Sequence, residues 1–142
     1  MPDYFDSLVI GTGPVGMVAA SGLAKAGISV GLIGPEPNLS RDGRTVAILD
    51  NGVCLLQSLG LWNEAQTKSA PLTEMRIIDD TGSLFRAPPV TFRAHELGLD
   101  AFGKNIELTD LVTSLSNILK TQKTIQWLSD TVRAFARDTD GL

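Results

Sequence analysis

The sequence predicts an α/β fold built on a parallel sheet, and two observations predict it. First, the apolar run from Phe5 to Ile10 ends at a glycine, which is typical of a buried strand. Second, the apolar residues after Pro14 recur at helical spacing, and another apolar run occupies residues 29–33. A strand, a tight turn, a helix and a strand in this order form a βαβ unit with parallel strands.

The helix of this unit has boundary signals at both ends. Proline at position 14 suits the first helical turn, because the N–H that it lacks has no intrahelical partner there. Gly27 suits the left-handed residue that follows a helix. Residues 34–43 are rich in Pro, Asn, Ser, Asp and Gly, which predicts a loop.

The middle of the chain is expected to contain one extended segment and two helices. Residues 45–49 are expected to be extended. Asp50 or Asn51 is expected to cap a helix that Gly60 ends. A second short helix is expected over residues 61–68.

The next stretch changes character. Residues 75–78 and 83–86 flank the turn sequence Asp79-Asp80-Thr81-Gly82, which predicts a hairpin. A further short strand is expected at residues 90–92. Because these strands interrupt the βαβ alternation, we expect residues 72–104 to be a β-rich insertion that belongs to a second domain.

Helical spacing returns at residues 108–119, where Thr109 is the expected cap. Residues 125–128 are the expected third parallel strand. Another extended segment is expected to start at residues 131–136, and a turn is expected at residues 138–141.

Composition argues against several functions. The formal net charge is −4 and no Lys/Arg-rich run is present, so no nucleic-acid partner is expected. One cysteine, Cys54, and one histidine, His95, exclude an internal disulfide and argue against a metal site made by the protein alone. Cys54 is expected to be a small buried side chain. No apolar run approaches the ~20 residues of a membrane span, so a cytoplasmic protein is expected.

The segment Gly11-Thr12-Gly13-Pro14-Val15-Gly16 has the spacing G-x-G-x-x-G. It follows a predicted strand and opens a predicted helix, which is the context in which this motif binds a dinucleotide. Gly11 would allow the sharp turn, Gly13 would let a pyrophosphate approach, and Gly16 would let helix and strand pack closely. The helix N-terminus presents N–H groups to the phosphates. These glycines, Pro14 and Val15 are therefore predicted to bind a cofactor; the alternative is a turn without a ligand.

One usual element of such a site is absent. An acid at the end of the second strand normally accepts hydrogen bonds from ribose hydroxyls. That position is Gly34, followed by Pro35 and Glu36. Glu36 is the predicted ribose contact from a displaced backbone, with water or a backbone group as the alternative. A missing acid also fits a 2′-phosphate, so NADP is a further alternative.

Asp42-Gly43-Arg44-Thr45 forms a second polar cluster just after the predicted loop. The fork-shaped guanidinium of an arginine suits bidentate contact with phosphate or ribose. Arg44 is therefore a candidate cofactor contact. For Arg44 and Arg41 the alternative is solvent exposure.

Together these residues resemble a known family. The glycine motif, the segment Asp42-Gly43-Arg44-Thr45-Val46-Ala47-Ile48-Leu49 and the segment Leu59-Gly60-Leu61-Trp62 are similar to flavin-dependent aromatic hydroxylases, in particular the ubiquinone-biosynthesis (UbiH-like) branch. The resemblance spans nearly the whole chain. Many flavoproteins share the glycine motif, whereas the second and third segments are more specific.

The resemblance implies a Rossmann-like βαβ FAD-binding domain, like that of p-hydroxybenzoate hydroxylase, with an inserted β-rich substrate domain. Arg44 matches an arginine that contacts the ribose and pyrophosphate region of FAD. Asn105 falls near a position, often Gln, that reaches the flavin side. Family members insert one oxygen atom into an electron-rich ring, which implies a polyprenylated phenol as substrate and NAD(P)H as a candidate electron donor. No catalytic acid or base is assigned.

Family members are much longer than this chain. We therefore expect a truncated N-terminal portion that binds FAD weakly or not at all, is inactive alone, exposes apolar surface, and self-associates or dimerises through its sheet. The apolar substrate implies peripheral association with the inner membrane or with a biosynthetic complex. The alternatives are an NAD(P)-binding dehydrogenase domain and a non-catalytic nucleotide-binding or dimerising remnant.

Overall fold

A computed structural model of the chain describes residues 4–37, 39–40 and 43–136. The chain divides into two compact units. The first contains residues 1–41 and 111–142, and the second contains residues 42–110.

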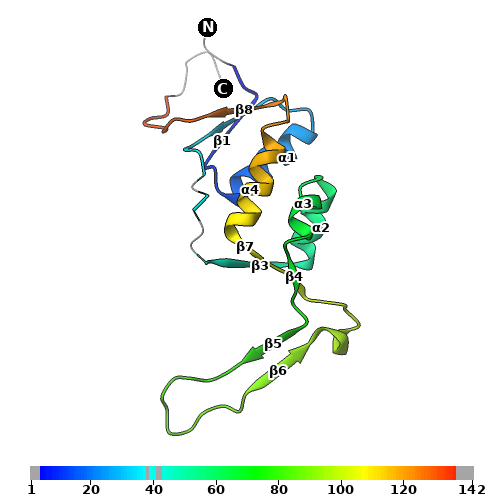
Figure 1. Cartoon of the computed structure of the whole chain (residues 1–142). Helices are drawn as coiled ribbons and strands as arrows, with labels where there is room; N and C mark the ends of the chain where they lie inside the picture. The colour runs from blue at the N-terminus through cyan, green and yellow to red at the C-terminus, as the bar shows by residue number, and fades with distance from the viewer. Residues whose placement is uncertain (1–3, 38, 41–42, 137–142) are drawn as a thin grey trace. The chain divides into compact units, whose positions relative to one another are not determined.

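The first unit contains the predicted parallel sheet. β1 (Ser7–Ile10), β2 (Val30–Ile33) and β8 (Ile125–Leu128) are hydrogen-bonded in the order β1-β2-β8 (Figure 1). α1 (Pro14–Lys25) connects β1 to β2, and α4 (Leu108–Leu119) precedes β8. The predicted α/β class, the βαβ unit and the third parallel strand are therefore confirmed.

The core of this sheet lies around its central strand. Val30 and Leu32 of β2 are fully buried, and α1 packs on the sheet with Met17 fully buried. The edge strand β1 differs, because Leu8 and Ile10 on one of its faces are about half exposed. The expected exposure of apolar surface is confirmed on this face.

The second unit contains an antiparallel sheet that the sequence did not predict in full. β3 (Thr45–Leu49), β7 (Gly103–Glu107) and β4 (Ala70–Pro71) pair in the order β3-β7-β4. α2 (Asp50–Ser58) follows β3 directly, and the short α3 (Asn63–Gln66) comes next. α3 is shorter than the helix expected over residues 61–68.

The predicted caps of two helices are wrong, and both errors have one cause. α2 begins at Asp50 after an N-cap at Leu49, and α4 begins at Leu108, one residue before Thr109. Each helix grows directly out of a strand. The N–H of Asp50 donates to the carbonyl of Phe102 at 3.1 Å, and the N–H of Leu108 donates to that of Arg44 at 2.9 Å. Backbone carbonyls of other segments of the same chain therefore accept from the first helical N–H groups.

The Leu59-Gly60-Leu61-Trp62 segment ends α2 as predicted. Gly60 has φ +73°, and the N–H of Leu61 donates to the carbonyl of Leu56 at 2.8 Å. Leu61 and Trp62 are 0% and 1% exposed. This segment therefore ends α2 and contributes two buried side chains to the core.

The predicted hairpin is wrong in its second strand. β5 (Glu74–Ile77) pairs with β6 (Val90–Arg93), not with residues 83–86. The register places Met75 opposite Phe92 and Ile77 opposite Val90, so these apolar residues share one face. The polar face holds an ion pair between Glu74 and Arg93 at 3.1 Å. Residues 83–86 lack this alternation and lie in a loop.

Asp79 organises the loop that joins the two strands. Its carboxylate accepts from the N–H of Thr81 at 3.1 Å and from the N–H of Ala87 at 3.0 Å. Gly82 has φ +74°, a backbone conformation that favours glycine, and the chain bends at Thr81. After β6, the 3₁₀ helix η1 (Ala94–Leu97) leads towards β7.

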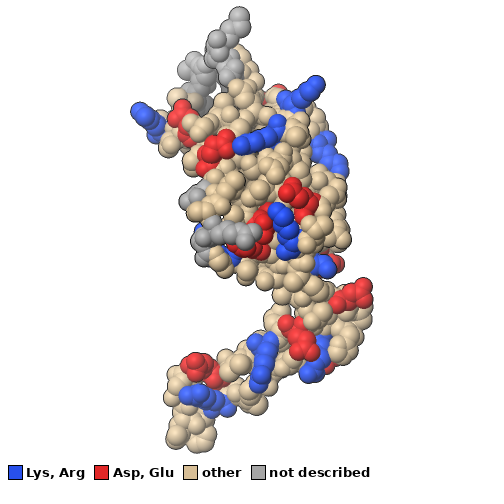
Figure 2. All heavy atoms as spheres, in the orientation of Figure 1, with Lys and Arg blue, Asp and Glu red and all other residues tan. Residues whose placement is uncertain are grey.

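Residues 129–136 form no strand, so the extended segment expected from residue 131 is not part of a sheet. The turn expected at residues 138–141 lies outside the described residues. Within the described part of the chain, no helix is long and apolar enough to span a membrane. On the face drawn in Figure 2, basic and acidic side chains are interspersed.

Candidate functional site

The turn between β1 and α1 has the strand-to-helix geometry that the glycine motif requires. Gly11 has φ +113°, and its N–H donates to the carbonyl of Ile33 at 2.8 Å. Gly13 is the N-cap of α1 without a side-chain cap, and Pro14 opens the helix. By helical geometry, the N–H groups of Val15 and Gly16 have no acceptor within the helix. They are donors available to an anion at this end of α1.

The three glycines differ in what surrounds them. A Cβ on Gly16 would lie on the carbonyl oxygen of Gly11, at a separation of 1.9 Å, so only glycine lets the helix approach the strand here. A Cβ on Gly13 would meet nothing within 4 Å, and the backbone there has φ −75°, a value that any residue can adopt. The fold therefore does not require glycine at position 13. The open backbone at Gly13 leaves room for the close approach of a pyrophosphate, which the donors at this end of α1 fit.

The segment after β2 explains the missing acid. Gly34 has φ +153°, and a Cβ there would lie 2.8 Å from the side chain of Thr12. The Thr12 hydroxyl donates to the carbonyl of Pro35 at 2.7 Å. No carboxylate can occupy position 34 in this arrangement. Glu36 follows two residues later; its side chain is 59% exposed and lies 2.9 Å from the Nζ of Lys120.

The other two predicted contacts belong to the second unit. Arg44 is exposed immediately before β3, and its carbonyl accepts from Leu108. Asn105 is half-buried in β7, paired with Ala47 and Ala70. The glycine turn and Glu36 lie together in the first unit. Arg41 lies outside the described residues.

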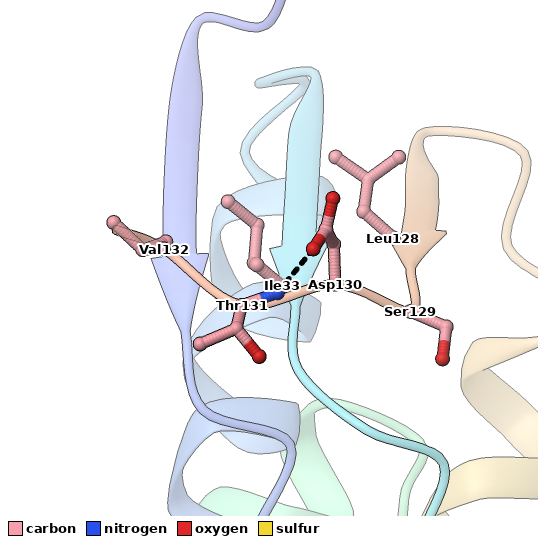
Figure 3. Close-up of a pocket in the computed structure, with 6 residues that line it drawn as sticks. All are labelled: Ile33, Leu128, Ser129, Asp130, Thr131 and Val132. Atoms are coloured by element: carbon pink, nitrogen blue, oxygen red, sulfur yellow. Dashed lines mark hydrogen bonds between the residues drawn. The ribbon is translucent and has the colours of Figure 1, made fainter. Parts of the chain in front are cut away.

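A hollow of about 380 Å³ lies beside the carboxyl ends of β2 and β8. Figure 3 shows its lining, which is Ile33 together with residues 128–132. The N–H of Thr131 donates to the Asp130 carboxylate at 2.6 Å. Sequence reasoning missed this hollow. The two predicted parallel strands were the available signal, because ligands of α/β sheets bind outside the carboxyl ends of strands.

The described residues offer little chemistry of their own. They contain no group of three or more His, Cys, Asp or Glu side chains placed to hold a metal. Cys54 is exposed, so its expected burial is wrong. His95 is exposed on η1.

Comparison with known proteins identifies the family. A model of the FAD binding domain family matches residues 4–135. The chain belongs to this family. The chain is 38% identical over 85 residues to ubiquinone hydroxylase UbiL of Rhodospirillum rubrum, an alignment that covers 56% of this chain and 20% of that protein. It is 26% identical over 143 residues to ubiquinone hydroxylase UbiM of Neisseria meningitidis, covering 96% of this chain and 31% of that protein.

Solved structures show the same fold. The chain matches PqsL, a probable FAD-dependent monooxygenase from Pseudomonas aeruginosa, with a TM-score of 0.70 and 19% identity over 97% of this chain and 36% of that one. It matches the flavin-dependent monooxygenase PieE, crystallised with FAD and substrate, with a TM-score of 0.65 and 16% identity over 89% of this chain and 24% of that one. The predicted FAD-binding family and its cofactor FAD are confirmed, and the two ubiquinone hydroxylases agree with the predicted resemblance to FAD-dependent aromatic hydroxylases. The chain spans a fifth to a third of the two curated relatives.

Proposed function

We propose that this chain carries the ADP-binding side of the FAD site in a monooxygenase that hydroxylates a polyprenylated phenol in ubiquinone biosynthesis. The observation that carries this proposal is the pair Gly13 and Gly16 in a chain of the FAD binding domain family. Only glycine fits at position 16, because a Cβ there would collide with the carbonyl of Gly11. Gly13, in contrast, borders open space at a helix N-terminus. The two UbiL and UbiM relatives are ubiquinone hydroxylases, which supports the substrate class.

The proposed contacts follow the parts of the cofactor. Gly11, Gly13, Pro14, Val15 and Gly16 hold the pyrophosphate through backbone and helix N–H groups. The Glu36 carboxylate accepts from ribose hydroxyls, Arg44 binds the ribose and pyrophosphate region, and Asn105 reaches the flavin side. Bound FAD supplies the redox chemistry, with NAD(P)H as the proposed electron donor. The chain's own residues bind and orient the cofactor.

The β5–β6 hairpin supports the proposed insertion. Met75, Ile77, Val90 and Phe92 lie on one face and are each about half exposed. An antiparallel sheet with one apolar and one polar face normally packs its apolar face on a core. We propose that residues 72–104 belong to a substrate domain and that the chain alone is inactive. An NAD(P)-dependent dehydrogenase is less well supported, because the family match is to FAD binding domains.

The same exposed face supports a proposal of self-association, as a homodimer or a larger assembly. The proposed location is the cytoplasm, peripheral to the inner membrane or to a biosynthetic complex, because a polyprenylated substrate partitions into lipid. Light scattering coupled to size-exclusion chromatography tests the self-association. A concentration-independent monomer contradicts it.

Binding is tested by changing Gly13 to Ala in the 142-residue chain. The added methyl group enters open space, so the fold is kept, and it blocks the close approach of a phosphate. We expect affinity for ADP and FAD, measured by NMR titration at millimolar ligand, to fall by about tenfold or more. Gly22→Ala is the matched control, because a Cβ at Gly22 of α1 also meets nothing within 4 Å.

Two results would contradict the proposal. If neither nucleotide shifts the backbone amides of residues 11–16, the turn is not a nucleotide site. If Gly13→Ala and Gly22→Ala bind equally well, Gly13 is not at the phosphates. Weak binding by the isolated chain is itself part of the proposal, and a yellow monomer with one FAD per chain would overturn that part.

A further inference from the structure

The segment 34–36, just after β2, is held by side chains from three other places in the first unit. The hydroxyl of Thr12, in the glycine turn, donates to the carbonyl of Pro35 at 2.7 Å. The indole Nε1 of Trp127, in β8, donates to the carbonyl of Gly34 at 3.2 Å. Lys120, just after α4, lies 2.9 Å from Oε2 of Glu36. The backbone and the carboxylate of this segment are thus fixed separately.

Lys120 and Trp127 also contact each other. The ammonium of Lys120 lies 5.8 Å from the centre of the Trp127 ring, within the range of a cation–π interaction. The contacts therefore form a closed network that runs from the Gly34 backbone through Trp127 and Lys120 to the Glu36 carboxylate. A closed network of contacts restricts the direction in which the carboxylate of an otherwise flexible glutamate points.

The ion pair between Lys120 and Glu36 contributes little to the stability of the fold. The side chains of Lys120 and Glu36 are 51% and 59% exposed, and ion pairs at this exposure are among the weakest in proteins. A carboxylate accepts on both oxygens, so Oε1 can accept from a ligand while Oε2 is held by Lys120. Position 34 cannot hold an acid, and Glu36 is the next carboxylate along the chain.

We infer that Lys120 and Trp127 are positioning residues that aim the Glu36 carboxylate at the ribose hydroxyls of the cofactor's adenosine half. This role rests on the proposed function, because it needs the pyrophosphate at the glycine turn. It replaces an acid at the strand end with an acid two residues later, which a distant lysine and tryptophan hold in place. Lys120 is 84 residues from Glu36 in sequence.

The test compares two ligands, ADP and 2′,3′-dideoxy-ADP, by NMR titration of the ¹⁵N-labelled 142-residue chain. The ligands differ only in the ribose hydroxyls, so the ratio of their affinities isolates that contact. We expect the wild-type chain to prefer ADP by about tenfold, as for a hydrogen bond to a charged group. Glu36→Gln should bring the ratio close to one. Lys120→Met should lower it severalfold, and Lys120→Arg should largely restore it.

Two further variants complete the test. Trp127→Phe keeps an aromatic side chain beside Lys120 and removes the Nε1 donor. It should lower the ratio of ADP affinity to dideoxy-ADP affinity less than Lys120→Met does. Lys123→Met removes an exposed lysine three residues away and should leave the ratio unchanged. All variants should keep the same affinity for dideoxy-ADP, because a loss of fold would weaken both ligands together.

The possible outcomes distinguish a failure of the positioning role from a failure of the proposed function. If ADP still shifts the amides of Gly13 and Gly16 but Lys120→Met keeps the wild-type ratio, the positioning role is wrong and the proposed function stands. If Glu36→Gln also keeps the ratio, the carboxylate does not contact the ribose. If neither ligand shifts the glycine turn, the proposed function fails and this inference fails with it.

Discussion

The turn between β1 and α1 and the β5–β6 hairpin are held in different ways. The turn is surrounded by fixed atoms: the carbonyl of Gly11 touches the backbone of Gly16, and the side chain of Thr12 fills the space at Gly34. A single added carbon atom at either glycine collides with its neighbour. The local conformation of the turn is therefore set by steric exclusion.

The hairpin lacks such surroundings. Among the residues that the structure describes, its two strands pair only with each other, and its apolar residues are about half exposed. Cross-strand contacts such as the Glu74–Arg93 ion pair, with both side chains about half exposed, are the main interactions that the described residues provide. An isolated two-stranded hairpin is marginally stable in water.

The difference teaches where sequence changes are tolerated. In the turn, the position of each glycine decides whether a change damages the fold or the proposed ligand site. In the hairpin, the cost of a change depends on whether another surface covers its apolar face.

The largest effect is expected for Gly16→Ala. The new Cβ would lie 1.9 Å from the carbonyl oxygen of Gly11, so α1 must move away from β1. We expect a loss of about 3 kcal/mol or more in the free energy of unfolding, measured by urea denaturation. Gly22→Ala in the same helix should be neutral or stabilising, because its Cβ meets open space.

Equal stabilities of Gly16→Ala and Gly22→Ala would show that the close contact between helix and strand is not maintained in solution. Gly13→Ala should resemble Gly22→Ala in stability while losing nucleotide affinity. The three substitutions add the same atom in one short stretch, so they separate a structural glycine from a ligand-facing one.

A smaller effect is expected for Phe92→Ser in the hairpin. Phe92 is 47% exposed, so its removal should cost less than about 1 kcal/mol, against the 3–5 kcal/mol typical of a buried phenylalanine. The same change should reduce self-association in light scattering. Thr91→Ser on the polar face is the control and should change neither quantity. A cost near 3 kcal/mol would mean that another surface covers the apolar face.

The contrast also explains how far the sequence predicted the fold. β1, α1, β2 and β8 were predicted because their periodicity is local. The partner of β5 was wrong, because the choice depends on the match between two distant alternations, Met75 and Ile77 against Phe92 and Val90. β7 was missed because Lys104 and Asn105 are poor strand formers; backbone pairing with β3 and β4 makes them a strand.

The candidate site was predicted in a similar way. The glycine spacing indicated the strand-to-helix turn, because the motif lies within six consecutive residues between a predicted strand and a predicted helix. The absence of an acid at Gly34 was noted, but its cause, the side chain of Thr12, was not visible in the sequence. Lys120 and Trp127 gave no signal, because they reach the segment after β2 from elements about ninety residues later. Contacts across that separation follow from tertiary structure.

The smallest effects concern two carboxylates whose pKa values are lowered by hydrogen bonds, Asp6 just before β1 and Asp79 in the loop of the hairpin. Ser29 donates to Asp6 and holds the pKa of that carboxyl below 3.8, and Ala87 and Thr81 do the same for Asp79. Because both folded-state values lie below the unfolded one, each group stabilises its surroundings above about pH 4. That contribution is lost as the pH falls through the folded pKa.

The two groups differ in what they hold together. Asp6 ties the start of β1 to the residue before β2, since the N–H and hydroxyl of Ser29 both donate to it. Asp79 holds only the loop between β5 and β6. Asp6→Asn should therefore lower the melting temperature at pH 7 and flatten its fall in acid, whereas Asp79→Asn should leave both unchanged. Asp79→Asn should instead speed hydrogen exchange at the amides of Thr81 and Ala87. If Asp79→Asn lowered the melting temperature as much as Asp6→Asn, the hairpin loop would be part of the cooperative fold and not an independently marginal region.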